Sequence, residues 1–146
     1  MKQARALALF AAIMAATCAS AQDSAVAPAN SKIGLWAAVG VTRPLFQLGE
    51  AKTIQVSFAV VNDGRALVDP KIDSSHLYIN GVEPKDWFLV IANGIRTLEF
   101  AALPPGKFLS FSYLLGPAYF VKPGIYTLRW EGPNLKASEC TFRVLP

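Results

Sequence analysis

The nine residues TIQVSFAVV at positions 53–61, followed by Asn62-Asp63-Gly64, decide the fold class of this chain. Apolar side chains occupy every second position of the stretch, and polar or small side chains stand between them. A period of two is typical of a β-strand that is buried on one face. The Asn-Asp-Gly sequence is typical of a turn that ends such a strand. The apolar positions are Ile54, Val56, Phe58 and Val60.

The same alternation recurs along the chain, with turn sequences such as Asn80-Gly81 and Pro104-Pro105-Gly106 between the segments. No stretch keeps a helical period for about ten residues, so no segment can serve as the crossover helix of a parallel α/β fold. About seven to nine short strands predict an all-β fold, an antiparallel β-sandwich, with a closed barrel as the alternative. The further strands are expected at 33–41, 75–79, 87–91, 95–100, 108–115, 125–130 and 138–145.

The order of these turns and strands resembles that of bacterial immunoglobulin-like domains, over about residues 45–144. Within that group it is most similar to the intracellular-proteinase-inhibitor type. The resemblance implies an immunoglobulin-like sandwich, and it implies a tyrosine corner at Tyr126, whose hydroxyl would bond to the backbone just upstream. The segments that carry it are Leu48-Gly49-Glu50, Asn62-Asp63-Gly64, Leu103-Pro104-Pro105-Gly106 and Lys122-Pro123-Gly124-Ile125-Tyr126.

Residues 1–21 have the pattern of a cleavable secretory signal peptide. Lys2 and Arg5 precede an uncharged apolar run at 6–16, and Ala19-Ser20-Ala21 predicts cleavage before Gln22. The apolar run is too short to span a bilayer as a helix. Cleavage would lower the net charge from +4 to +2 and leave a flexible leader at 22–32 and one domain at 33–146. The protein is therefore expected in the periplasm or outside a bacterial cell, without a membrane span.

A lipoprotein acylated at Cys18 is the alternative to simple cleavage. Ala15 and Thr17 match the required flanking residues poorly. Cleavage before Gln22 would leave Cys140 as the one cysteine, so the mature chain could form no internal disulfide. Because Cys140 alternates with Phe142 and Val144, we expect it on the buried face of a strand.

Few residues of the predicted mature chain could carry catalysis. It has one histidine, His76, which falls out of phase with Leu77 and Ile79 and is expected on a solvent face. One histidine and one cysteine cannot build a zinc or copper site, so we expect no catalytic, cofactor-binding or metal-binding residues and no cofactor. Basic residues are scattered singly, so nucleic acid is not an expected partner. Calcium held by Asp63, Asp69 and Asp73 is an open alternative.

Surface recognition is the remaining class of function. Trp36 falls on the solvent face of its strand, unless a loop or the leader covers it, and His76 and Tyr78 share the solvent face of theirs. Each adjacent aromatic pair, Trp87-Phe88 and Tyr119-Phe120, must turn one member outward within a strand. The candidate surface contacts are Trp36, His76, Tyr78, Trp87, Tyr119 and Phe120.

These observations predict an exported, non-catalytic binding or structural module of the bacterial cell envelope. Its partner would be another envelope or secreted protein, with carbohydrate as the alternative ligand. The alternative function is that of a protease inhibitor or accessory subunit, which would present a loop around 116–123 to an enzyme.

Overall fold

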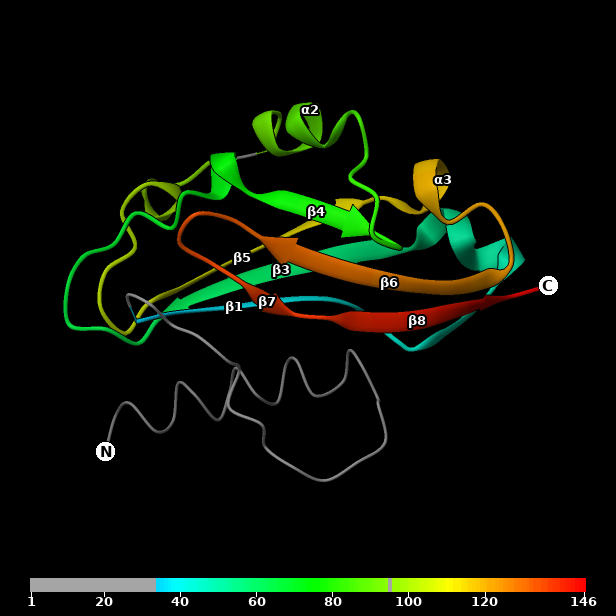
Figure 1. Ribbon diagram of the computed structural model, residues 1–146, viewed down its shortest axis with the longest axis horizontal. Coiled ribbons are helices and arrows are strands. Elements are labelled where there is room, and N and C mark those ends of the chain that lie inside the picture. Colours follow the sequence, from blue (N-terminus) through cyan, green and yellow to red (C-terminus); the bar gives the residue numbers. More distant parts are fainter. Residues whose placement is uncertain (1–33, 95) are drawn as a thin grey trace, which may run out of the picture.

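Two four-stranded sheets pack face to face in the computed structural model, which describes residues 34–94 and 96–146 (Figure 1). The eight strands confirm the prediction of a β-sandwich. The first sheet has the order β5 (Phe108–Leu114), β3 (Gln55–Asn62), β1 (Leu35–Val41) and β7 (Ala137–Ser138). The second has the order β2 (Leu45–Gln47), β8 (Cys140–Leu145), β6 (Gly124–Glu131) and β4 (His76–Ile79).

The prediction of purely antiparallel sheets is wrong, because β7 runs parallel to β1 and β2 runs parallel to β8. The chain leaves the first sheet after β1 and enters the second sheet at β2, just beyond Pro44, whose ring cannot continue a ladder. The backbone N–H of Arg143 donates to the Pro44 carbonyl at 2.9 Å, which fixes the crossing point. With β3 and β5 paired in one sheet and β4, β6 and β8 in the other, the order is that of an immunoglobulin-like sandwich.

The inward faces of both sheets form one hydrophobic core, as the alternation predicts. Phe58 of β3 lies at its centre, with its ring centroid 5.2 Å from that of Phe111 on β5 and 5.1 Å from that of Trp130 on β6. Burial of each such side chain stabilises the fold by about 1.5–3 kcal/mol before conformational entropy is subtracted. The four apolar positions of the 53–61 stretch are all buried.

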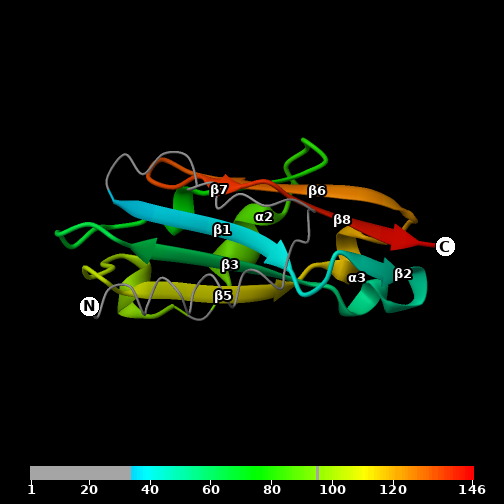
Figure 2. The same cartoon turned by 90° about the horizontal axis from the view of Figure 1, so that it is seen from below.

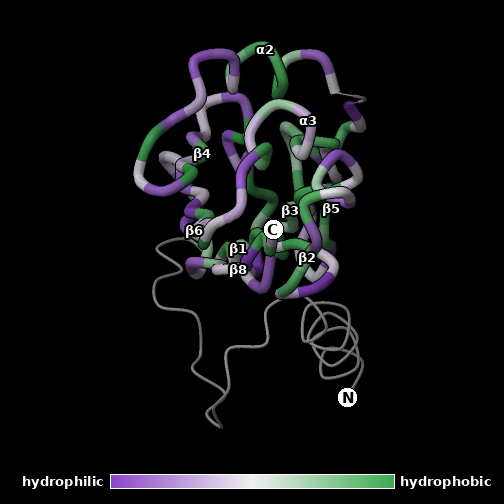
Figure 3. The backbone as a smooth tube through the Cα atoms, turned by 90° about the vertical axis from the view of Figure 1, so that its right-hand side faces the viewer, coloured by the Kyte–Doolittle hydropathy of each residue, from purple (hydrophilic) through white to green (hydrophobic). Residues whose placement is uncertain are grey.

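The prediction of a strand at 87–91 is wrong, because this segment forms helix α2 (Trp87–Ala92). Trp87 and Ile91, four residues apart, are buried on one side of the helix, while Phe88 and Leu89 are exposed. Figure 3 shows α2 over the border of the sandwich where β4 and β5 lie, opposite the border formed by β1 and β8. Trp87 connects the two sheets there, since its indole N–H donates to the Ser75 carbonyl at 2.8 Å and its ring contacts Tyr113 of β5.

Four further short helical segments also replace regions expected as strands or loops. The strand expected at 95–100 is absent among the described residues of that segment, which contain a single 3-10 turn. The connection at 116–123 begins with a helical turn rather than an open loop. The segments are η1 (Leu48–Thr53), η2 (Ile72–Ser74), η3 (Leu98–Phe100) and α3 (Gly116–Tyr119).

Tyr126 confirms the expected tyrosine corner. Its hydroxyl donates to the backbone carbonyl of Lys122, four residues upstream, at 2.8 Å. Its ring stacks on Phe142 with a centroid distance of 5.5 Å. The bond therefore ties the loop before β6 to the core.

Cys140 is buried on the inward face of β8, as the alternation predicts. In the 146-residue chain it is disulfide-bonded. The prediction of a lone thiol applies to the chain after cleavage and stays a prediction. The predicted signal peptide, the leader and Cys18 lie outside the described residues. Within 34–94 and 96–146, no helix has the length and hydropathy needed to cross a membrane.

Candidate interaction surface

The free edge of β5 is the most open backbone edge of the sandwich. Four strands border the two sheets, and β5 has seven residues where β4 has four, β2 has three and β7 has two. Natural proteins protect exposed edges with short strands, lysine or proline. Strand β5 reads FLSFSYL and carries no charge and no proline. Figure 2 shows it at the border of the first sheet.

The backbone groups that β5 presents at this edge follow from its pairing with β3. The N–H of Asn62 donates to the carbonyl of Lys107 at 2.9 Å, and the register continues from this pair to Gln55 opposite Leu114. Alternate residues of an antiparallel strand bond to the same neighbour. Residues 109, 111 and 113 therefore bond to β3, and the N–H and C=O groups of residues 108, 110, 112 and 114 point outward.

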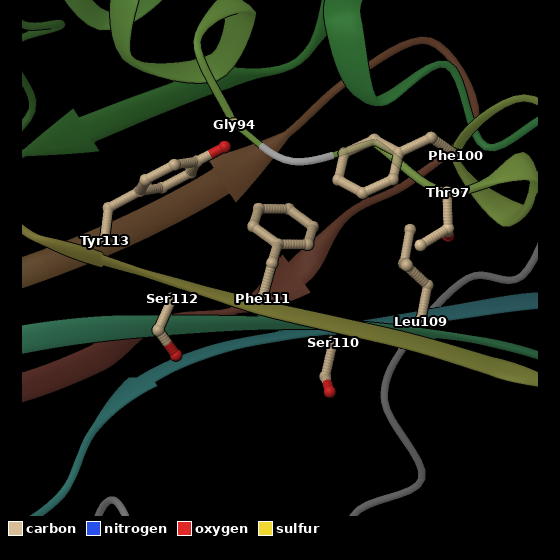
Figure 4. A pocket seen from close by; sticks show the side chains of 8 residues that line it. All are labelled: Gly94, Thr97, Phe100, Leu109, Ser110, Phe111, Ser112 and Tyr113. Carbon is tan, nitrogen blue, oxygen red and sulfur yellow. The ribbon is translucent and has the colours of Figure 1, made fainter.

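A pocket lies beside this edge, between β5 and the chain after α2 (Figure 4). Its cavity volume is about 330 Å³. The rings of Phe100, Phe111 and Tyr113 lie on the pocket side of β5, and the hydroxyls of Ser110 and Ser112 point to the opposite side. Within residues 34–94 and 96–146, no strand fills the position next to β5 that the fourth strand of this sheet occupies in immunoglobulin domains. The rings of Phe111 and Tyr113 are only partly buried there.

Gly94 sets the width of the pocket. A Cβ atom at this position would lie 2.4 Å from the hydroxyl oxygen of Tyr113, so only glycine lets the chain pass this close to the ring. Burial raises the pKa of Tyr113, although the positive charge of Arg96 opposes the shift. Arg96 forms an ion pair with Asp73, and its guanidinium lies 5.8 Å from the Phe100 ring centroid. The pocket is thus aromatic, with a phenol hydroxyl at one end and a paired arginine beside it.

The outward face of β5 adds two exposed apolar side chains. Phe108 and Leu114, at the two ends of the strand, are 57% and 55% exposed. Between them Ser110 and Ser112 are exposed, and the Ser112 hydroxyl lies 2.9 Å from the Ser57 hydroxyl of β3. Polar residues are usual on a solvent face, so the two apolar ends are the unusual feature of this strand.

The structure separates the sequence-predicted contact residues into different surfaces. Trp36 is half-buried on the outer face of the first sheet, where it lies opposite Val61. His76 and Tyr78 do share the outer face of β4, as predicted, but each already contacts a charged side chain. His76 Nδ1 lies 2.7 Å from a carboxylate oxygen of Glu83, and the Arg129 guanidinium lies 4.4 Å from the Tyr78 ring centroid.

Two of the predicted contacts are wrong as surface residues, because Trp87 and Phe120 are buried in the core. The helix turns Phe88 outward instead of Trp87, and Phe88 is 69% exposed. Tyr119 is half-buried, and its hydroxyl donates to the Asp86 carboxylate. Burial and this bond raise the pKa of Tyr119 to about 12.

The connection at 116–123 is anchored at several points. Gly116 packs on the backbone of η1, Phe120 is buried, and Tyr119 is bonded to Asp86.

No group of three or more His, Cys, Asp or Glu residues gathers in the part of the chain that the structure describes. Asp69 pairs with Lys71 at 2.7 Å, mainly through a side-chain bond that lowers the pKa of Asp69, and Asp73 pairs with Arg96. Two of the three carboxylates proposed for calcium, those of Asp69 and Asp73, therefore face cations of their own.

The pocket beside β5 was not predicted from the sequence. Its walls come from η3 and from the segments on both sides of it, and part of this region was expected to form a strand at 95–100. A signal was nevertheless present, because Phe108 and Leu114 place apolar side chains at polar positions of an otherwise regular alternation.

No family model matches this chain, and no curated protein matches it. Among solved structures it is similar to the CARDB domain of a Pyrococcus furiosus protein. The solution structure of that domain is 19% identical, with 77% of this chain and 94% of that chain covered and a TM-score of 0.46. A crystal structure of the domain in complex with di-metal ions is 16% identical, with 86% and 100% covered and a TM-score of 0.47.

Proposed function

We propose that this protein is an exported, non-catalytic binding module of the bacterial cell envelope, which binds an extended segment of a protein along β5. The observation that carries the proposal is the uncharged seven-residue edge with an aromatic pocket beside it. Export is supported by the signal-peptide pattern of residues 1–21.

Binding would use the mode in which a peptide adds a strand to a sheet edge. The outward N–H and C=O groups of β5 supply main-chain hydrogen bonds, which give affinity to any extended chain. The pocket supplies selectivity, because a volume of about 330 Å³ is at the small end of the range for ligand sites and suits one large apolar side chain. We expect a branched or aromatic side chain against Phe100 and Phe111.

The proposed non-catalytic role is supported by the way the titratable side chains are paired. His76 is paired with Glu83 on an exposed face, and Arg96 and Asp73 are paired with each other. Among the hydrogen bonds of the described residues, no nucleophilic side chain is bonded to either pair. Tyr113, at the pocket, has a raised pKa and so remains a neutral phenol at physiological pH.

Capture from envelope fractions with matched edge variants tests the proposal. Ser110→Pro removes an outward N–H without removing a bond to β3, so we expect captured protein to fall about tenfold or more. Ser110→Ala changes the same side chain but keeps the N–H, and it should capture as the unchanged protein does. Equal capture by the unchanged protein and Ser110→Pro would overturn the proposed edge, and turnover of a substrate by the purified protein would overturn the non-catalytic role.

A further inference from the structure

Strand β5 is nearly a palindrome in the chemistry of its side chains. Read from either end, FLSFSYL gives a large apolar residue, a second large residue, a serine and then the central phenylalanine. Phe108 therefore corresponds to Leu114, Leu109 to Tyr113 and Ser110 to Ser112. A strand of this kind is complementary to a copy of itself turned end to end.

We propose that the β5 edge pairs antiparallel with β5 of a second copy of this chain, about a two-fold axis at Phe111. This inference rests on the proposed role of the edge as a binding surface and names its partner. The two first sheets would join into one continuous sheet across the interface. Such an interface is isologous, with the same residues contributed by both copies.

The backbone geometry is compatible with this register. In it, Ser110 of each copy lies opposite Ser112 of the other, and Phe108 lies opposite Leu114. All four residues have outward N–H and C=O groups by the pairing with β3 described above. Hydrogen-bonded pairs of an antiparallel ladder require such groups on both strands. A shift by one residue would oppose outward groups to inward ones, so the backbone excludes shifts by an odd number of residues.

The side chains and charges favour a second copy in the same register. On the outer face each exposed Phe108 would contact an exposed Leu114, and both would lose contact with water. On the inner face Leu109 would lie opposite Tyr113, so that each copy would help to close the pocket of the other. Because β5 carries no charged residue, the two edges meet without repulsion between like charges.

The expected dimer is weak. Seven residues at about 3.3 Å each form a contact about 23 Å long and only one strand wide. Stable complexes usually bury a broader surface, of about 800 Å² per partner. We expect a dissociation constant in the micromolar range, so that the dimer forms as the concentration rises. If this protein is held at high local concentration in the cell envelope, most of its copies would be dimeric.

Sedimentation equilibrium of the purified protein over a concentration series, with variants that introduce charge on β5, tests the inference. Phe108→Lys should raise the dimer dissociation constant about tenfold or more, because it places an ammonium against Leu114. The double variant Phe108→Lys with Leu114→Glu should recover most of the affinity, since each new cation would face a new carboxylate of the other copy. Ile125→Lys is the matched control, because Ile125 is 55% exposed on the second sheet and should leave the constant unchanged.

Circular dichroism and the melting temperature of each variant separate loss of pairing from loss of folding. A protein that stays monomeric through the millimolar range, or a dimer that Phe108→Lys does not weaken, would overturn the second-copy inference. Failure of the double variant to recover the dimer would overturn the register. If the protein is monomeric while Ser110→Pro still abolishes capture of an envelope partner, this inference fails and the proposed function stands.

Discussion

Ser75 is a buried polar residue on which two tryptophans of the core converge. The Trp87 indole N–H donates to its carbonyl, and the Trp130 indole N–H donates to its hydroxyl at 2.9 Å. Ser75→Ala removes the second acceptor and leaves a buried N–H unpaired, which costs about 1–3 kcal/mol. Urea unfolding should show this loss, and Ser138→Ala, at an exposed serine, should change stability by less than about 0.5 kcal/mol. Equal stability of the two variants would contradict the role of the Ser75 hydroxyl.

Tyr119 predicts a dependence of stability on alkaline pH. Its folded-state pKa of about 12 lies above the value near 10 of an unfolded chain, because burial and the bond to Asp86 favour the neutral phenol. Its stabilising contribution is therefore complete below about pH 10 and is lost as the pH rises toward 12. Tyr119→Phe should remove the tyrosinate absorbance step near pH 12, whereas Tyr78→Phe should retain it. A step that survives in Tyr119→Phe would contradict the assignment.

At the scale of elements, Gly116 lets α3 lie directly on η1. Its N–H donates to the Ile54 carbonyl at 3.0 Å, and a Cβ atom there would lie 1.9 Å from the Ala51 carbonyl oxygen. Gly116→Ala would force the two elements apart, at a cost of about 1–3 kcal/mol. Gly49→Ala is the matched control, since nothing lies within 4 Å of its added methyl group. Chemical denaturation should lower the midpoint for Gly116→Ala alone, and an equal shift in both variants would contradict this packing.

The success of sequence prediction differs between elements for a physical reason. Strands β3, β5 and β6 alternate between core and solvent, so a period of two identifies both the strand and its buried face. Helix α2 is a continuous apolar run of six residues, and such a run has no period that separates a short helix from a buried strand. Tertiary context decides its form. Trp87 and Ile91 are buried while Leu89 between them is 56% exposed, which a helix allows but a strand with one buried face does not.

At the scale of the whole molecule, the sequence predicts the two-sheet architecture but not the pocket beside β5. The sandwich follows from alternation within each strand, whereas the pocket follows from the absence of a strand beside β5. Helix α2 lies over the border between the sheets, and the chain that follows it forms no ladder within its described residues 96–100. The alternation of β5 predicts that Phe111 and Tyr113 point inward. The arrangement of the neighbouring segments leaves their rings half-buried and places them in the pocket wall.

The proposed export is a property of the whole chain and can be tested separately from binding. Expressed in a bacterium, the chain should reach the periplasm with a mass that begins at Gln22, because Ala19 and Ala21 present small side chains to the signal peptidase. Ala21→Tyr should block cleavage and retain the precursor. Ser20→Tyr lies at the intervening position, where side-chain size is not restricted, and should be processed normally.

The intact mass distinguishes the alternatives. A mature chain that begins with an acylated Cys18 would replace simple cleavage by lipidation. An uncleaved chain in the cytoplasm would overturn export. In that case Lys2 and Arg5 would remain with the domain, and the net charge would stay at +4 instead of falling to +2. The edge of β5 is unaffected by either result, so its tests keep their meaning wherever the protein is found.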